Sequence, residues 1–224
     1  FDTKSSKIIP SPSTNFTIDF AVINSIQAVG SGTLTANNSY IIGNTSGWII
    51  NSPASRELYW IGSTGYWNNS ANWAISSGGP GGNCPPSPID NVNFDVNSFT
   101  GINDTVWIYF ESSFCNNMDW TGATGFPIFY TFSNTPTQIN GSIICNPAMK
   151  IWSPFEMTGS DTSFVTTNGL TIPGITFTGT GTFKLTDNLT VKSLLNVENG
   201  TFQTDNHLVN CNEFIFGSNW DSTV

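Results

Sequence analysis

The sequence GTFKLTDNLTV at residues 181–191 is followed by the closely similar GTFQTDNHLV at residues 200–209. Between the two copies, Gly-Thr-Phe, Thr-Asp-Asn and Leu recur in the same order and at nearly constant offsets. A period of roughly 19 residues, with short β-segments and Asn/Gly turns, is typical of a parallel β-helix, in which stacked coils bury inward-pointing Phe, Leu and Val. Only two copies align, so a β-sandwich with chance similarity stays open as the alternative.

The rest of the chain shows the same strand-rich pattern. Runs of β-branched and aromatic residues bounded by Gly, Asn, Ser and Pro predict strands, and these runs lie at residues 16–23, 105–110, 127–132, 139–144, 175–185 and 213–216. No window carries the i, i+3, i+4, i+7 apolar spacing of an amphipathic helix, and 21 Gly and 12 Pro interrupt the chain. The sequence therefore predicts an all-β protein built from β-solenoid coils.

The charge composition excludes several classes of partner. Only 9% of the residues are charged, and 15 acidic residues against 6 Lys and Arg give a net charge of -9. Such a chain does not bind a phosphate backbone, so nucleic acid is excluded. No apolar run approaches the roughly 18 residues that span a bilayer, so direct membrane insertion is excluded as well. The first residues, Phe1-Asp2-Thr3, favour the interpretation that the sequence is a soluble piece of a longer protein.

An unusually aromatic stretch, YWIGSTGYWNNSANW at residues 59–73, is called here the aromatic joint. Its tryptophans can pack inward and seal one end of a solenoid, whose terminal coil would otherwise expose apolar edges. Alternatively, Trp60, Tyr66 and Trp67 can lie outside and stack on sugar rings. We expect the inward arrangement, with Tyr66 the residue left at the surface.

Four cysteines, Cys84, Cys115, Cys145 and Cys211, form no CxxC pair, and the single His207 cannot complete a zinc site with such scattered partners. Two disulfides are therefore expected, and we take the Cys84–Cys115 and Cys145–Cys211 pairing among the three that are possible. Buried free thiols are the alternative. Disulfides would place the chain in an oxidising, extracellular setting.

Several segments resemble a known family. They are YWIGSTGYWNNSANWAISSGG at residues 59–79, Cys84 with PSPIDNVNFDVNSFT at residues 86–100, and CNNMDWTGATGFP at residues 115–127. Together they resemble the recurring module of giant secreted Bacteroidetes surface proteins, the SprB-like gliding-motility adhesins, and NSYIIGNTSGW at residues 38–48 resembles the end of a preceding module. The resemblance implies a long, repetitive protein exported to the cell surface by the type nine secretion system.

The resemblance and the sequence pattern together predict three parts. Residues 1–52 would end a preceding β module, residues 53–135 would form the disulfide-containing joint and first β layer of the next, and residues 136–224 would be truncated solenoid coils. The expected function is structural and adhesive, with gliding or attachment produced by many weak contacts. The expected partners are a surface polysaccharide or another extracellular surface, and the outer-membrane export and motility machinery. A carbohydrate-binding module is the main alternative.

The sequence offers candidate calcium ligands and candidate O-glycosylation acceptors. Asp90 and Asp95, with nearby asparagines, offer oxygen ligands of the kind that calcium takes, but they fit no EF-hand or β-roll spacing and serve turns equally well. No other cofactor is expected. The short Bacteroidetes O-glycosylation pattern fits Asp104-Thr105-Val106 and Asp221-Ser222-Thr223, which makes Thr105 and Ser222 candidate acceptors.

The sequence contains few candidate catalytic residues. Polysaccharide-degrading β-helices use paired carboxylates, and the pairs available are Glu111 with Asp119 and Asp187 with Asp205. The second pair repeats with the turns of the coils, and the chain has one His and no GxSxG motif. We therefore expect that the chain is not an enzyme. Ice binding through alternating Thr in TFTGTGTF at residues 176–183 is a further minor alternative, because solvated strand faces carry the same pattern.

Overall fold

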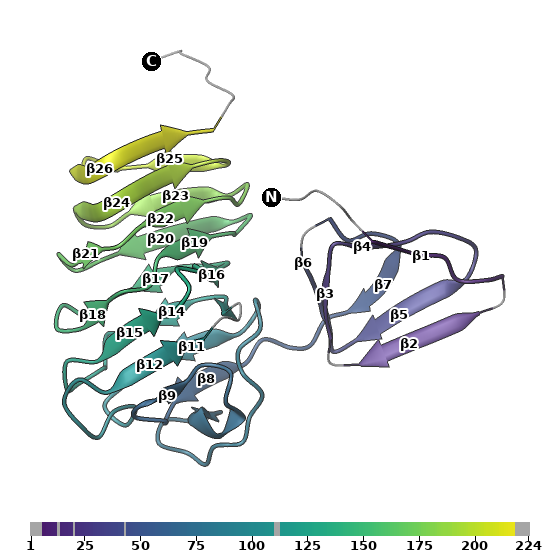
Figure 1. Cartoon of the computed structure of the whole chain (residues 1–224), viewed down its shortest axis with the longest axis horizontal. Helices are drawn as coiled ribbons and strands as arrows, with labels where there is room; N and C mark the ends of the chain where they lie inside the picture. The colour runs from purple at the N-terminus through teal and green to yellow at the C-terminus, as the bar shows by residue number, and fades with distance from the viewer. Residues whose placement is uncertain (1–5, 13, 20, 43, 110–112, 218–224) are drawn as a thin grey trace. The chain divides into compact units, whose positions relative to one another are not determined.

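The computed structural model describes residues 6–12, 14–19, 21–42, 44–109 and 113–217 of the chain (Figure 1). About 45% of the residues lie in strands and 1% in helix, and the parallel strands stack as a β-solenoid of about 10 turns. The predicted solenoid fold is therefore confirmed. The chain divides after Ser55 into two compact units, Phe1–Ser55 and Arg56–Val224, here called the N-terminal and the C-terminal unit.

The N-terminal unit is itself a short stack of parallel coils. Its strands are β1 (Ser6–Ile8), β2 (Asn15–Asp19), β3 (Val22–Asn24), β4 (Ile26–Ala28), β5 (Thr33–Asn37), β6 (Tyr40–Ile42) and β7 (Trp48–Asn51). β1 pairs with β4, β2 with β5, β5 with β7, and β3 with β6, and every pair is parallel. Ile23, Leu34 and Ala36 form its small buried core.

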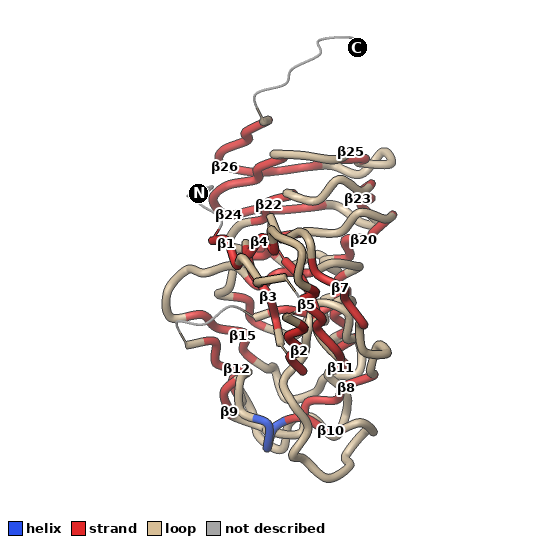
Figure 2. Tube along the Cα trace, turned by 90° about the vertical axis from the view of Figure 1, so that its right-hand side faces the viewer, coloured by secondary structure: helices blue, strands red, loops and turns tan. Residues whose placement is uncertain are grey.

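The C-terminal unit has three strand faces. Face 1 contains, in spatial order, β10 (Trp73–Ala74), β8 (Glu57–Trp60), β11 (Asn91–Asn93), β14 (Met118–Asp119), β17 (Ile143–Ile144), β20 (Thr162–Thr166), β23 (Thr182–Leu185) and β25 (Thr201–Gln203). Face 2 contains β18 (Lys150–Ile151), β15 (Ile128–Thr131), β12 (Thr105–Ile108) and β9 (Gly65–Tyr66). Figure 2 shows strands of successive coils lying side by side, which leaves few backbone groups unpaired inside the stack.

Face 3 carries the return path of each coil. Its strands are β13 (Phe114–Cys115), β16 (Thr137–Ile139), β19 (Phe155–Met157), β22 (Ile175–Phe177), β24 (Leu189–Val197) and β26 (Val209–Phe216), with β21 (Thr171–Ile172) joining at β24. The first part of β24 pairs with β21 and its last part with β22. One long strand thus continues across the position where earlier coils have two separate strands.

Inward-pointing residues of face 1 form one continuous apolar ladder. Strand pairing aligns Leu58, Val92, Met118, Ile143, Val165 and Leu185, and all six are buried. The segment between successive members becomes steadily shorter from the first pair to the last, so the coils shorten toward the C-terminus. Alternation along each strand sends the neighbouring side chains outward, which separates a dry core from a polar surface.

The repeat that predicted the fold is in register, with one exception. Phe183 pairs with Phe202, as the alignment of the two sequence copies requires. Leu189 pairs with Val209 rather than with Leu208, which is 74% exposed. The turn before this strand contains Asp205 and Asn206, both with positive φ, and it shifts the register by a single position. The shift turns the first side chains of β26 to the opposite face, and a second register change between Val191 and Leu194 restores the original offset, with Leu194 opposite Glu213.

The aromatic joint closes the N-terminal end of the C-terminal unit. β10 runs antiparallel to β8 and covers the edge of face 1, after the 3-10 helix η1 (Ser70–Asn72). Trp60, Trp67 and Trp73 are all buried, and the indole nitrogens of Trp60 and Trp73 donate to backbone oxygens at 3.0 and 2.7 Å. The expected inward packing of these tryptophans is therefore confirmed. Covering the edge also protects it from pairing with another chain.

The predicted disulfides are not found, because all four cysteines are free thiols. Cys145 follows β17, whereas Cys211 lies in β26, in the same coil as β25 and beyond the coils that contain β20 and β23. With about 4.8 Å between strands, these residues are too far apart for a bond that needs Cα atoms within roughly 7 Å. Cys84 is exposed in a loop, while Cys115 is fully buried on β13. The disulfide-containing joint was therefore a wrong prediction.

The thiols should differ strongly in reactivity. Burial, and secondarily the charge of Asp187, raises the pKa of Cys145 to about 12, and burial likewise raises the pKa of Cys115. Because the thiolate is the reactive form, native protein treated with iodoacetamide should be modified first at Cys84, with Cys115 and Cys145 protected until unfolding. Timed mass spectrometry measures this order. A Cys84→Ser variant should lose the fast phase of modification. Early modification of Cys115 would contradict its buried position on β13.

Candidate functional site

An outward cluster of aromatic side chains covers face 2 of the C-terminal unit. It is called here the aromatic surface, and it consists of Tyr66, Trp107, Tyr109, Tyr130, Phe132 and Trp152. The strands of face 2 place them there because Trp107 on β12 and Tyr130 on β15 alternate with neighbours that point into the core. Their neighbours Val106, Ile108 and Phe129 point inward and are buried.

Strand register aligns four of these residues in one row across the strands. Tyr66 of β9 pairs with Trp107 of β12, and Trp107 pairs with Tyr130 of β15. Trp152 follows β18, and its backbone nitrogen donates to the oxygen of Phe129 at 2.8 Å, which continues the row into a fourth coil. The row therefore crosses the strands from one coil to the next.

The rings of the aromatic surface contact one another. The centroid of Trp107 lies 5.1 Å from those of Tyr130 and Phe132, and Tyr109 lies 5.1 Å from Phe132. Tyr66 and Tyr109 are 6.3 Å apart in an edge-to-face arrangement. Mutual packing of this kind holds the rings in place while leaving their outer parts in solvent. The exposed fractions are 48% for Tyr66, 51% for Tyr109, 45% for Phe132 and 58% for Trp152.

The aromatic surface carries almost no charge. Among the described residues of β9, β12, β15 and β18, Lys150 is the one ionisable side chain besides the tyrosines, and its Nζ donates to Asn103 Oδ1 at 3.0 Å. Asp104, just before β12, accepts hydrogen bonds from Thr64 Oγ1 and from the backbone of Gly101. Its carboxylate therefore serves the turn rather than the surface.

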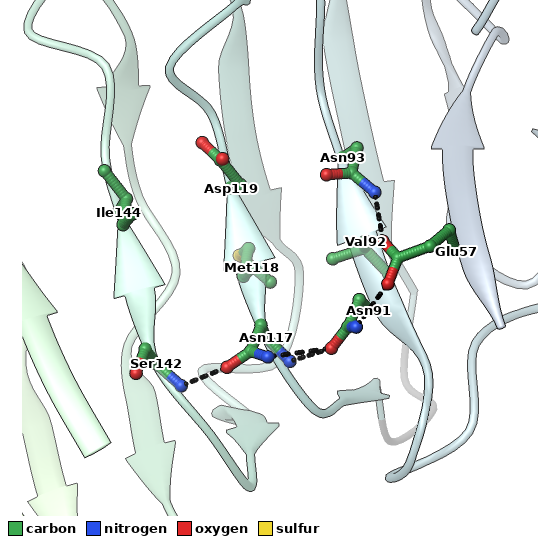
Figure 3. Close-up of a pocket in the computed structure, with 9 residues that line it drawn as sticks. All are labelled: Glu57, Asn91, Val92, Asn93, Asn117, Met118, Asp119, Ser142 and Ile144. Atoms are coloured by element: carbon green, nitrogen blue, oxygen red, sulfur yellow. Dashed lines mark hydrogen bonds between the residues drawn. The ribbon is translucent and has the colours of Figure 1, made fainter. Parts of the chain in front are cut away.

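A polar groove of about 220 Å³ lies on face 1 (Figure 3). It is lined by Glu57, Asn91, Val92, Asn93, Asn117, Met118, Asp119, Ser142 and Ile144. Asn91 Nδ2 and Asn93 Nδ2 donate to the two carboxylate oxygens of Glu57, at 2.5 and 3.0 Å. Asn117 Nδ2 donates to Asn91 Oδ1 at 2.8 Å, and the backbone nitrogen of Ser142 donates to Asn117 Oδ1 at 2.7 Å.

These bonds make the polar groove a ladder that links four successive coils, as the dashed lines of Figure 3 show. Asp119 also uses a carboxylate oxygen locally, because Oδ1 accepts from the backbone nitrogen and the hydroxyl of Thr121, at 2.8 and 2.6 Å. Hydrogen-bonding groups that are paired with one another offer less to a ligand. The groove therefore stabilises the stack, and the aromatic surface is the better candidate for binding.

The sugar-binding residues expected from the aromatic joint are only partly accessible. Trp60 and Trp67 are buried, so neither can stack on a sugar ring. Tyr66 is half-exposed and belongs to the aromatic surface. The five other aromatic residues of that surface were not predicted as binding residues. Strand alternation in TVWIY at residues 105–109 was the available signal, because it sends Trp107 and Tyr109 to one side.

The two candidate calcium ligands, Asp90 and Asp95, serve structural roles. Asp90 accepts hydrogen bonds from the backbone nitrogen, Nε and Nη2 of Arg56, at 2.9, 3.0 and 2.6 Å, and from the backbone nitrogen and hydroxyl of Ser87. Asp95 caps a turn through the backbone nitrogen of Asn97 at 2.8 Å. A carboxylate surrounded by donors has few lone pairs left for a cation. Within the described residues, no cluster of three His, Cys, Asp or Glu is placed to hold a metal.

The Arg56–Asp90 pair also fastens the proline-rich loop, defined as residues 76–88, to the first coil. Arg56 Nη1 donates to the oxygen of Cys84 and Nη2 to that of Pro85, both at 3.3 Å. Asp90 is almost fully buried, whereas the side chain of Arg56 is one-third exposed. One guanidinium thus joins the start of the C-terminal unit to a loop that follows the whole aromatic joint in the chain.

Among the candidate modification and catalytic residues, Thr105 and Asp187 lie in the part of the chain that the structure describes and make hydrogen bonds within the fold. Thr105 is 6% exposed, and its hydroxyl donates to the backbone oxygen of Asn103, so the folded surface does not present it. Ser222 and Glu111 lie outside the described residues. Asp187 accepts from Thr167 and from the backbone nitrogen of Gly169, which is a turn-capping role.

The fold and the aromatic surface define a class of protein, a parallel β-solenoid with a capped N-terminal end and an uncharged aromatic face. The chain matches no protein-family model, no curated protein and no solved structure. None of the described helical segments has the length and apolar character needed to cross a membrane.

Proposed function

We propose that this chain is a structural and adhesive segment of a large protein at the cell surface, which attaches to extracellular material through many weak contacts. The aromatic surface is the observation that carries the proposal, since it is exposed, uncharged and built on a rigid stack of coils. Tyr and Trp supply large contact areas at low entropic cost. Repeating such a segment along a filament would convert weak single contacts into firm attachment.

The solenoid also suits a load-bearing role. Its three faces pair successive coils by backbone hydrogen bonds, and a continuous apolar ladder fills the interior. Because each coil contacts mainly its neighbours, a longer stack adds length without needing a new core. The resemblance to SprB-like adhesins supports the same role, with export by the type nine secretion system and attachment to a surface polysaccharide. The cap formed by the aromatic joint would then mark where one stack begins.

Attachment should depend on the number of copies displayed. Beads that carry many copies of the chain should resist flow on polysaccharide-coated glass, with an apparent affinity roughly 100-fold or more above that of the soluble monomer. Bead detachment under increasing flow measures this difference. Beads carrying an unrelated acidic protein of similar size are the control. If both kinds of bead detach at the same flow from every coating, the adhesive function is wrong.

A further inference from the structure

We propose that the aromatic surface binds a single uncharged polysaccharide chain that runs across the strands of face 2, from coil to coil. This inference rests on the adhesive function proposed above and names the ligand of that site. It depends on three properties of the aromatic surface, which are its register, its ring chemistry and its lack of charge.

Strand register places aromatic side chains of successive coils in a row with a regular spacing. Tyr66, Trp107, Tyr130 and Trp152 come from four successive coils, and neighbouring strands are about 4.8 Å apart. A linear polymer laid along this row meets one aromatic side chain of the row at each coil. An irregular protein surface has no such repeat, so a repeating polymer is the better match to a surface that is itself repeated. Tyr109 and Phe132 lie beside the row and widen it.

The ring chemistry suits a pyranose. One face of many sugar rings presents C–H groups, which carry slight positive charge and pack against the negative face of an aromatic ring. Trp152 and Tyr66, at the two ends of the row, are both about half-exposed and can make this contact. The phenol hydroxyls of Tyr66 and Tyr130 can donate hydrogen bonds to sugar hydroxyls and accept them in return. An apolar polymer would leave these hydroxyls without partners.

The charge distribution selects an uncharged chain. Lys150 is the only cation among the described strands of face 2, and it already donates to Asn103. Binding of a uronic acid polymer would require a cation at each repeat, and the chain as a whole has a net charge of -9. The same charge disfavours an anionic lipid surface. A neutral glucan or xylan meets neither obstacle.

Native affinity electrophoresis tests the proposal with the complete chain. Hydroxyethyl cellulose, mixed-linkage glucan and xylan in the gel should retard the protein, whereas polygalacturonate and alginate should not. Trp152→Ala and Tyr66→Ala remove half-exposed rings at opposite ends of the row, so both variants should fold, and each should weaken binding about ten-fold. Phe164→Ala is the matched control, since Phe164 is comparably exposed but lies on β20 of face 1.

Binding should also depend on ligand length. Oligosaccharides of a retarding polymer should gain affinity from two to about four sugar units and little beyond, because the row has four members. Equal retardation by acidic polymers, competition by phosphatidylcholine vesicles, or unchanged binding in both end variants would overturn the proposal. Bead attachment that survives in the Trp152→Ala and Tyr66→Ala variants would overturn this inference and leave the adhesive function standing.

Discussion

Trp73→Ala should lower the free energy of unfolding of the C-terminal unit by about 4 kcal/mol, in the range measured for truncation of large buried side chains. Trp73 is fully buried, and its ring centroid lies 5.1 Å from that of Trp60 and 4.9 Å from that of Trp67. Its indole nitrogen donates to the backbone oxygen of Trp67 at 2.7 Å. The substitution therefore removes both a core ring and a hydrogen bond from the cap.

The measurement is thermal unfolding followed by circular dichroism, where a loss of this size should lower Tm by roughly 10 °C. Tyr66→Ala is the control, because Tyr66 lies in the same aromatic joint but is half-exposed, and its removal should cost less than about 1 kcal/mol. A Tm for Trp73→Ala equal to that of the unmodified protein would show that the joint does not act as the cap of the stack.

Asp90→Asn should lower the free energy of unfolding by about 3 kcal/mol, near the lower end of the range expected when one partner of a buried ion pair is removed. The lower end applies because Arg56 is partly exposed, so solvent screens its charge once the carboxylate is gone. The substitution also weakens the hydrogen bonds that Ser87 donates, at 2.8 and 2.7 Å, and loosens the loop that Arg56 holds through Cys84 and Pro85.

The same pair should make stability depend on pH. Burial alone would raise the pKa of Asp90, but hydrogen bonds from Arg56 and Ser87 outweigh it and hold that pKa below its ordinary value of 3.8. The folded state therefore binds the proton more weakly than the unfolded state. The contribution of Asp90 to the free energy of unfolding is complete above pH 3.8. It is lost as the pH falls through the lower pKa that Asp90 has in the folded state.

Denaturant titrations between pH 7 and pH 2 measure this contribution. The difference in stability between the unmodified protein and Asp90→Asn should be constant near neutral pH and should shrink in acid. Asp161→Asn, at an exposed carboxylate, is the control and should change stability by less than about 0.5 kcal/mol at neutral pH. A constant difference down to pH 2 would contradict the depressed pKa.

The sequence predicted the fold from local signals. Alternating apolar residues and Asn/Gly turns are properties of neighbouring residues, and the sequence repeat that aligns Phe183 with Phe202 is also their structural register. Earlier coils could not be recognised in the same way. Leu58 and Val92 pair although the cap and the proline-rich loop are inserted between them. Insertions of varying length hide a structural period from sequence comparison.

The sequence also identified the aromatic joint correctly as a seal, because three tryptophans among small polar residues have few other places to pack. It failed on the cysteines. Pairing Cys145 with Cys211 requires knowing how many coils lie between them, and that number is set by turns whose lengths vary. The residues that form a turn can be recognised from the neighbouring sequence, but the distance between two coils cannot.

By itself, the sequence determined that the chain is all-β, that its last coils stack in parallel, and that Tyr66 would lie outside a tryptophan seal. Only the tertiary structure decided that Tyr66, Trp107, Tyr130 and Trp152 share one surface. The proline-rich loop and β11 separate Tyr66 from Trp107 in the chain, and β13 and β14 separate Trp107 from Tyr130. A binding surface that crosses strands is assembled by the stacking of coils, because hydrogen-bonded register brings together residues that no local pattern connects.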